Sequence, residues 1–191
     1  QIPHGEILLS TRKLTAVRDV DPIDDAMVLE AGVTLHEAHQ QAARVGRRFT
    51  VGVASEGSCT IGGLISTNAG GTAVLRYGVM RDQILGVEAV LPNGEVWNGL
   101  KRLRKDNTGY DLKHLLIGAE GTLGIITAAS LKLYPLLASR CVAIAAVETP
   151  HQAIALLARA KDESGGAVEA FELMSRLGVA MAIRNIPGLR E

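Results

Sequence analysis

A glycine-rich stretch at residues 53–78, VASEGSCTIGGLISTNAGGTAVLRYG, carries the residue types best suited to binding chemistry. Seven glycines occur from Gly52 to Gly78, both included, and short Ser, Thr and Asn side chains lie among them. Glycine inside a helix or strand costs about 0.5–1 kcal/mol relative to alanine, so we expect no ordinary helix or strand here. Bare backbone permits close approach, and hydroxyl and amide groups can bond to a ligand's oxygens. This composition is typical of a site for a phosphate or a flat polar ring, and equally of a structural turn.

Two common phosphate-binding motifs are absent from the sequence. No G-x-G-x-x-G follows a predicted strand, and no G-x-x-x-x-G-K-[ST] occurs. A nucleotide would therefore bind through neither a Rossmann fingerprint nor a Walker loop.

Four motifs in order connect the glycine-rich stretch to a known family. SEGSCTIGGLISTNAGG is followed by LRYG, then by LRKDNTGYDL and by IGAEGTLGIIT. Together they resemble the FAD-linked oxidase family with the vanillyl-alcohol-oxidase-type flavin fold, and within it most resemble the D-lactate, glycolate and D-2-hydroxyglutarate dehydrogenases. The resemblance covers essentially all 191 residues. It implies an α+β fold, namely the C-terminal part of a PCMH-type FAD-binding domain followed by the start of a ferredoxin-like substrate (cap) domain.

The resemblance also implies a domain boundary. Residues 1–138 would belong to the FAD-binding domain, and residues 139–191 would begin the substrate domain. The chain opens at Gln1 without an initiator methionine, and family members are longer at both ends. We therefore expect an internal fragment that lacks the N-terminal subdomain with its phosphate-binding glycine loop. Whether this piece alone holds FAD is left open by the sequence.

The implied cofactor is FAD, bound non-covalently along the CTIGG and STNAGG segments. Gly62 and Gly63 leave no Cβ to clash with a ligand, and the neighbouring side chains are neutral hydrogen-bonding groups. The segment EGTLGII, residues 120–126, would return under the adenosine half, where Glu120 could accept from a ribose hydroxyl. The alternatives are a glycine-rich loop pair that packs on itself, and a surface carboxylate that caps a turn. The predicted cofactor-binding residues are Gly57, Ser58, Thr60, Ile61, Gly62, Gly63, Ser66, Thr67, Asn68, Gly70, Glu120, Gly121, Gly124, Ile125 and Ile126.

Cys59 lies beside the glycine pair, where a covalent flavin link could form. Some flavin enzymes of this broad fold attach FAD through Cys or His, but the most similar subfamily binds it non-covalently. We interpret Cys59 as a small packing thiol. Arg76 and Tyr77 could reach toward the flavin or the substrate, or could simply pack the loop.

The activity implied by the resemblance is oxidation of a small D-2-hydroxy acid to the 2-oxo acid, with hydride transfer to flavin N5. The family's catalytic residues lie in the later substrate domain, where a divalent metal could also bind. No catalytic residue is identifiable in this chain, which we expect to be inactive alone. The alternatives are another oxidation on the same flavin fold, of a sugar lactone or an alcohol, and a non-catalytic FAD-binding fragment. The sequence identifies neither the acid nor the electron acceptor.

Composition excludes other classes of function. Twenty Lys and Arg residues balance twenty Asp and Glu residues, so nothing indicates nucleic-acid binding. Apolar residues make up 47% and aromatic residues 3%, which predicts an aliphatic core, and no apolar run reaches the roughly 18 residues of a membrane span. Cys59 and Cys141 have no disulfide-framework spacing, as is usual in a reducing compartment. We expect a cytoplasmic protein, mitochondrial in a eukaryote, that could form homo-oligomers.

The elements that must position these residues follow from hydrophobic spacing and capping signals. Apolar runs predict strands at residues 6–10, 27–31, 84–91, 95–97, 122–134, 141–147 and 168–173. Helices are predicted at 35–45, after a capping box at Thr34; at 110–117, capped from 106–108; from Pro150 to the glycines at 165–166; and after Ser175. His36 and His39 are three apart on the first helix, but H-E-A-H is not the zinc motif H-E-x-x-H, so we expect solvated histidines and no metal site. The basic run KRLRK at 101–105 is expected to be a solvated loop or helix face.

Overall fold

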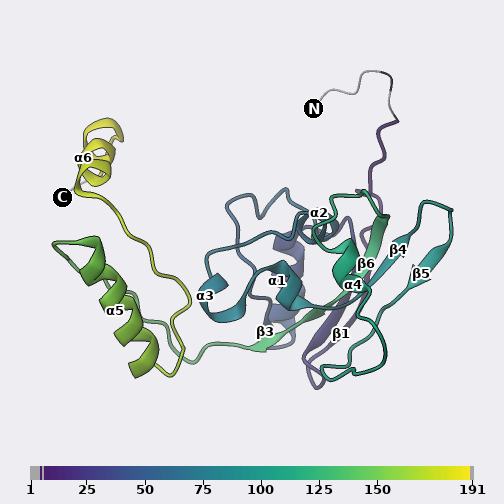
Figure 1. Cartoon of the computed structure of the whole chain (residues 1–191). Coiled ribbons are helices and arrows are strands. Elements are labelled where there is room, and N and C mark those ends of the chain that lie inside the picture. The colour runs from purple at the N-terminus through teal and green to yellow at the C-terminus, as the bar shows by residue number, and fades with distance from the viewer. Residues whose placement is uncertain (1–4, 6, 190–191) are drawn as a thin grey trace. The chain divides into compact units, whose positions relative to one another are not determined.

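The computed structural model describes residue 5 and residues 7–189. A first compact unit ends at Arg140, and a second begins at Cys141. In the described residues, the first unit is built on a five-stranded antiparallel sheet with the order β1-β2-β6-β4-β5 (Figure 1). The strands are β1 (Val17–Asp21), β2 (Ala26–Glu30), β6 (Ile125–Lys132), β4 (Ile84–Val90) and β5 (Val96–Asn98). A small second sheet pairs β3 (Arg47–Arg48) with β7 (Tyr134–Pro135).

Helices cover one face of the large sheet and enclose an aliphatic core. The helical elements of the first unit are α1 (Leu35–Arg44), α2 (Ile61–Ser66), α3 (Val74–Tyr77), the 3-10 helix η1 (Met80–Gln83) and α4 (Lys113–Leu116). Leu35 of α1 and Ile61 of α2 are fully buried in one cluster with Leu29 of β2. The predicted α+β class and the aliphatic core are therefore confirmed.

The start of α1 follows the predicted capping signal in part. The Thr34 hydroxyl accepts a hydrogen bond from the Glu37 amide at 3.2 Å. The Glu37 carboxylate accepts from Gln41 and does not complete the capping box. The helix ends before Gly46, whose φ of +70° continues the chain in a left-handed conformation that glycine tolerates.

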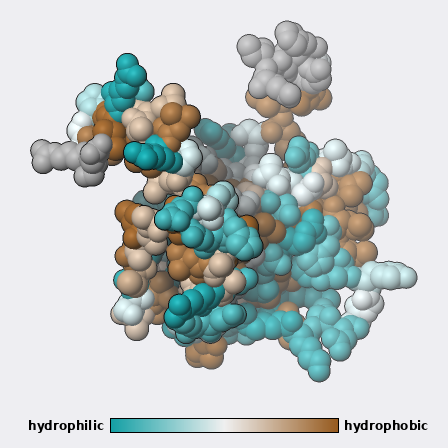
Figure 2. All heavy atoms as spheres, turned by 60° about the vertical axis from the view of Figure 1, so that its left-hand side comes forward, coloured by the Kyte–Doolittle hydropathy of each residue, from teal (hydrophilic) through white to brown (hydrophobic). Residues whose placement is uncertain are grey.

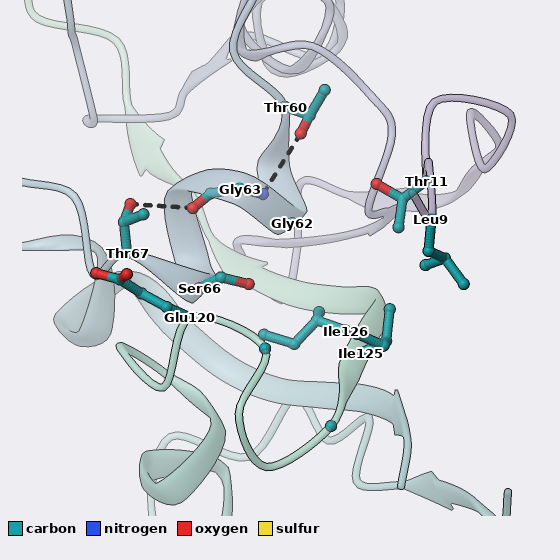
Figure 3. A pocket seen from close by; sticks show the side chains of 12 residues that line it. Leu9, Thr11, Thr60, Gly62, Gly63, Ser66, Thr67, Glu120, Ile125 and Ile126 are labelled. Atoms are coloured by element: carbon teal, nitrogen blue, oxygen red, sulfur yellow. Dashed lines mark hydrogen bonds between the residues drawn. The ribbon is translucent and has the colours of Figure 1, made fainter. Parts of the chain in front are cut away.

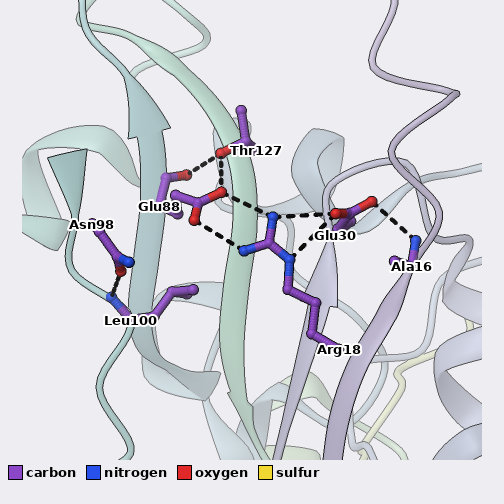
Figure 4. A network of polar contacts seen from close by, with 7 residues as sticks. All are labelled: Ala16, Arg18, Glu30, Glu88, Asn98, Leu100 and Thr127. Carbon is purple, nitrogen blue, oxygen red and sulfur yellow. Dashed lines mark hydrogen bonds and ion pairs between the residues drawn. The ribbon is translucent and has the colours of Figure 1, made fainter. Parts of the chain in front are cut away.

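The opposite face of the sheet carries an ion-pair network (Figure 4). Side chains alternate between faces along a strand, so Glu30 and Glu88 point away from the side that buries Leu29. The Arg18 guanidinium lies between these two carboxylates, with N–O distances of 3.1 Å to Glu30 and 2.9 Å to Glu88. The Thr127 hydroxyl donates to Glu88 at 2.7 Å. The hydrogen bonds from Arg18 hold the pKa of Glu88 below its usual range, and the bond from Thr127 lowers this pKa further. Burial of the carboxylate acts in the opposite direction and raises the pKa.

We expect the free energy of unfolding to fall in acid, in part because of Glu88. The folded pKa of Glu88 lies below its unfolded value of about 4.3, so its stabilisation is complete above that value and is lost as pH falls through the folded pKa. Arg18→Met should remove most of this pH dependence, because only the Thr127 bond would still lower the Glu88 pKa. It should cost about 1–2 kcal/mol at neutral pH, a small figure because 35% of the Arg18 side chain is exposed. Urea denaturation across the acid range measures both effects, and Glu95→Gln on the exposed β4–β5 turn is the control. A pH profile of Arg18→Met that parallels the wild type would contradict the assignment.

Several predicted strands are not formed. Residues 7–10 adopt no strand, and Glu6 lies outside the described residues. Residues 141–147 and 168–173 also form no strand. A strand needs hydrogen-bonded neighbours, and these runs have none in the described residues; the side chain of Ile144 is 90% exposed. Conversely, β1 was not predicted, because a register shift between Val17 and Asp19 breaks the two-residue alternation.

The glycine-rich stretch does contain helices, so that expectation was wrong. Residues 61–66 form α2, capped by Thr60, and residues 74–77 form α3. The predicted helix at 110–117 is reduced to α4, and Leu112 precedes it without a side-chain cap. Asp106, a predicted cap, instead accepts from the Thr108 amide and from Lys101 in a turn. The 101–105 segment is a solvated loop, and its Arg102 pairs with Asp19 of β1.

The second unit contains two helices and no strand among its described residues, namely α5 (Pro150–Glu163) and α6 (Arg176–Asn185). Thr149 and Gln152 form the predicted capping box at α5, and the Ser175 hydroxyl caps α6 through the Gly178 amide. Apolar side chains such as Val142 and Leu177 stay exposed, and Figure 2 shows apolar residues among polar ones at the molecular surface. That this unit begins a ferredoxin-like substrate domain stays a prediction.

Candidate functional site

A groove in the first unit lies between α2 and the loop that leads into β6 (Figure 3). Its smaller cavity, of about 310 Å³, is lined by Leu9, Thr11, Thr60, Gly62, Gly63, Ser66, Thr67, Glu120, Gly121, Gly124, Ile125 and Ile126. A neighbouring cavity of about 650 Å³ shares Leu9, Thr11, Thr60, Gly63 and Thr67 with it and continues along residues 53–59. Cavities of a few hundred Å³ are usual for small-molecule sites.

The first turn of α2 is held against the end of β2. The Ile61 amide donates to Val33 O at 2.9 Å, and the Gly62 amide donates to Ala31 O at 2.8 Å. A Cβ on Gly62 would lie only 2.7 Å from the Cβ of Ala31. Gly62 therefore permits close helix-to-sheet packing, which corrects the expectation that its missing Cβ makes room for a ligand.

Gly63 has the opposite surroundings. It is exposed, and a Cβ there would meet only the Thr60 hydroxyl, at 3.3 Å. Its amide is bound weakly by the same hydroxyl, at 3.4 Å, and its carbonyl accepts from the Thr67 hydroxyl at 3.0 Å (Figure 3). The bare backbone of Gly63 thus faces the groove.

The loop from Gly118 to Gly124 forms the other wall. The Gly118 amide donates to Ile65 O at 3.1 Å and the Glu120 amide donates to Ser66 O at 3.0 Å, which fixes the loop against the end of α2. Gly118, Glu120 and Gly121 have φ values of +82°, +50° and +81°. A left-handed conformation is uncommon for a non-glycine residue such as Glu120, and such residues cluster at functional sites.

The groove offers mostly neutral hydrogen-bonding groups. In the part of the chain that the structure describes, the Ser66 hydroxyl and the amides of Gly121 and Gly124 have no hydrogen-bond partner. Among the described residues that line the smaller cavity, Glu120 alone carries a carboxylate. Such groups suit a ligand with sugar hydroxyls, a polar ring or phosphate oxygens.

The groove brings together most of the predicted cofactor residues. Ten of them line the smaller cavity, and Ser58 lines the larger one. Four of the predicted residues are not among the described residues that line either cavity: Gly57, Ile61, Asn68 and Gly70. Ile61 is fully buried in the core, and Asn68 accepts from the Arg81 amide. The binding roles of all these residues stay predictions.

Other groove residues were missed by sequence reasoning. Leu9 and Thr11 line both cavities, and Val53 and Ser55 line the larger one. No motif marks residues 9 and 11, because only the folded chain brings them to α2. Ser55 lies in the quoted motif and could have been included on that ground.

Three further residues singled out in the sequence can now be placed. Cys59 is partly buried, packs against the core and lines the larger cavity. The Tyr77 ring packs edge-on against the Tyr134 ring, with 4.8 Å between their centres, and the Arg76 guanidinium lies 5.1 Å from the centre of the Tyr77 ring. Arg76 and Tyr77 are not among the described residues that line the two cavities. These contacts agree with a packing role for Arg76 and Tyr77, and a role toward the flavin or the substrate stays a prediction.

His39 is not the solvated histidine that was expected. Its Nδ1 lies 3.0 Å from the Glu56 carboxylate and its Nε2 lies 2.8 Å from Val51 O, so the half-buried ring ties α1 to the 51–56 segment. Glu56 has a lowered pKa, chiefly because of its hydrogen bond with His39.

In the described residues no group of three His, Cys, Asp or Glu side chains could hold a metal ion. None of the helices there is long and apolar enough to cross a membrane.

Comparison with known proteins identifies the family. A family model described as an FAD binding domain matches residues 1–99. The chain belongs to this FAD-binding family. The solved structure of an alkyldihydroxyacetonephosphate synthase superposes with a TM-score of 0.60 at 27% identity, over 67% of this chain and 23% of that one. The predicted α+β fold of a PCMH-type FAD-binding domain is thus confirmed.

Curated relatives share most of this FAD-binding chain. The D-2-hydroxyglutarate–pyruvate transhydrogenase of Saccharomyces cerevisiae is 40% identical over 184 residues, 96% of this chain and 37% of that protein. The mitochondrial D-2-hydroxyglutarate dehydrogenase of Arabidopsis thaliana is 37% identical over 97% of this chain and 33% of its own length. The Bos taurus enzyme of the same name is 48% identical over 68% of this chain and 24% of its own length. The chain therefore spans well under half of the length of each of these three relatives.

The groove fits the family's cofactor. FAD combines a flat polar ring, a chain of hydroxyls and a pyrophosphate. The exposed backbone at Gly63, the Ser66 hydroxyl and the amides of Gly121 and Gly124 match these oxygen and nitrogen groups. The adjoining cavities give room for an elongated ligand.

Proposed function

We propose that this FAD-binding chain is part of an enzyme that oxidises a small D-2-hydroxy acid to the corresponding 2-oxo acid. The observation that carries the proposal is the groove, which joins the glycine-rich segment to the Glu120–Ile126 loop from a distant part of the sequence. The relatives named above, one a transhydrogenase and the others dehydrogenases of D-2-hydroxyglutarate, support the substrate class.

In this proposal the chain binds and orients FAD non-covalently. The Gly63 backbone and the hydroxyls of Thr60, Ser66 and Thr67 would lie along the cofactor, and the amides of Gly121 and Gly124 would donate to its oxygens. Glu120 would accept from a sugar hydroxyl. Ile125 and Ile126 would exclude water from the same wall.

The redox step needs little from this chain beyond that placement. Bound FAD supplies the hydride acceptor at N5. We assign no described residue to removal of the substrate's hydroxyl proton, and we propose that the group that takes it, with any divalent metal, lies outside this chain. Cys59, packed against the core, is proposed to have no covalent link to the flavin.

The test is anaerobic flavin reduction. The complete purified protein, loaded with FAD, should lose its visible flavin absorbance with D-2-hydroxyglutarate or D-lactate and keep it with the L-enantiomers. The isolated 191-residue chain should show no turnover with the same acids, even with excess FAD.

A second candidate is another reaction on the same fold, which the similarity to an alkyldihydroxyacetonephosphate synthase structure favours. Loss of the visible flavin absorbance with a sugar lactone or a primary alcohol, but with no 2-hydroxy acid, would favour that candidate. Failure of the complete protein to retain FAD would refute both.

A further inference from the structure

Arg81 of η1 joins three parts of the fold. Its Nη1 donates to His114 O at 2.8 Å, and its Nη2 donates to Ile117 O. These carbonyls belong to the end of α4, where helix carbonyls lack partners within the helix. The Arg81 backbone amide donates to the Asn68 side chain at 2.9 Å, just after α2. One residue therefore ties α2, η1 and the end of α4 together.

The chain beyond Ile117 is the wall of the groove. Gly118 and Glu120 bond to the end of α2, as described above, and residues 118, 120 and 121 all have positive φ. Glycine adopts a positive φ without strain, but Glu120 does so at a cost, and such a residue persists only when its surroundings hold it in place. The Arg81 bond to Ile117 O lies immediately before that segment, at its point of attachment.

Packing at Gly118 shows how closely these groups meet. A Cβ on Gly118 would lie 3.3 Å from Arg81 Nη2 and 3.4 Å from Asn68 Cβ. Asn68 itself has a φ of +49°, and its side chain accepts from Arg81. Asn68, just after α2, therefore binds Arg81, and Arg81 binds the end of α4. The loop that follows α4 then binds the end of α2 again through its Gly118 and Glu120 amides.

The guanidinium is also held from its outer side. Arg81 Nη1 lies 3.1 Å from His114 Nδ1, and because the guanidinium only donates, this nitrogen accepts. The His114 proton is then on Nε2, which lies 3.2 Å from the Asp111 carboxylate. Burial, aided by the charge of Lys113, lowers the pKa of His114, in agreement with a neutral ring.

We propose that Arg81, with Asn68 as its partner, is a positioning residue for the cofactor site. It lies outside both cavities as described and acts through the loop, by fixing the backbone from Gly118 to Gly124 in the conformation that faces the groove. The role toward the cofactor rests on the proposed FAD site, whereas the role in ordering the loop does not.

The experiment combines hydrogen exchange in the FAD-free protein with FAD titration of the complete protein. In Arg81→Met, amide exchange of Gly118 and Glu120 should accelerate by about tenfold or more, and FAD affinity should fall on the order of tenfold. Exchange in β2 and β6 should be unchanged. Arg81→Lys should give an intermediate result, because one ammonium group cannot reproduce the forked contact to two carbonyls.

Arg102→Met is the matched control. This arginine pairs with Asp19 and Asp21 away from the groove, so its loss should leave loop exchange and FAD affinity as in the wild type. If Arg81→Met fails to fold, Asn68→Gly serves in its place, since glycine keeps the positive φ and removes the side chain that accepts from the Arg81 amide.

Unchanged loop exchange in Arg81→Met would overturn the proposal. Faster exchange with unchanged FAD affinity would overturn the role toward the cofactor. A wild-type protein that binds no FAD would instead refute the proposed function, while faster loop exchange in the variant would still support the ordering role of Arg81.

Discussion

Replacing Gly62 by valine is expected to destabilise the FAD-binding fold by about 2–4 kcal/mol, before any ligand is considered. The new Cβ would start 2.7 Å from the Cβ of Ala31. The two elements cannot separate easily, because the Gly62 amide donates to Ala31 O at 2.8 Å. Relief of the clash would therefore break a hydrogen bond between α2 and the end of β2.

Alanine variants give this prediction its sharpest test. Helix propensity alone predicts that Gly62→Ala stabilises α2 by about 1 kcal/mol, whereas the contact with Ala31 predicts a loss of stability. Adding Ala31→Gly removes the opposing Cβ and should restore part of the loss. Thermal and urea unfolding of the FAD-free chain measure these effects, with Gly57→Val at an open, exposed position as the control. Wild-type stability of Gly62→Val would refute the packing role.

Leucine at the adjacent glycine should have the opposite outcome, with the fold kept and the cofactor lost. Gly63 is exposed, and leucine is a good helix former, so Gly63→Leu should change stability by no more than about 1 kcal/mol. Its side chain would project into the groove that both cavities share. FAD affinity should then fall on the order of 100-fold, about 2.7 kcal/mol.

Titration of FAD, followed by flavin fluorescence, and circular dichroism at matched protein concentration separate affinity from folding. Ala43→Leu, at an exposed position of α1 outside both cavities, is the control and should bind FAD as the wild type does. Wild-type FAD affinity in Gly63→Leu would show that the cofactor lies elsewhere.

Features with local causes were predictable from the sequence. Thr149, Pro150 and Gln152 carry the complete start of α5 within four residues, and the structure forms it as predicted. The turn between β4 and β5 follows from Asn93 and Gly94, whose φ is +87°. The motifs also pointed to most residues of the groove, because each motif is a continuous segment that folds as one piece.

Features that depend on distant partners were not predictable. The glycine at 62 faces Ala31, and nothing near either residue in the sequence indicates that they meet. β1 is recognisable only once its bulge is paired with β2. The apolar run at 141–147 has the composition of a strand, but composition cannot supply the neighbouring strand that its backbone needs.

The place of β6 in the sheet has a consequence for the order of assembly. β6 lies between β2 and β4, and Glu30 pairs with Ala128, which the ribosome adds much later. During synthesis, β2 and the β4–β5 hairpin therefore stay unpaired with each other until β6, the last strand of the sheet, is inserted between them. The pairing of β2 with β6 joins residues far apart in the sequence, and such pairing is slow to form. The loop that walls the groove leads directly into β6, so the proposed flavin site is complete only after this final insertion.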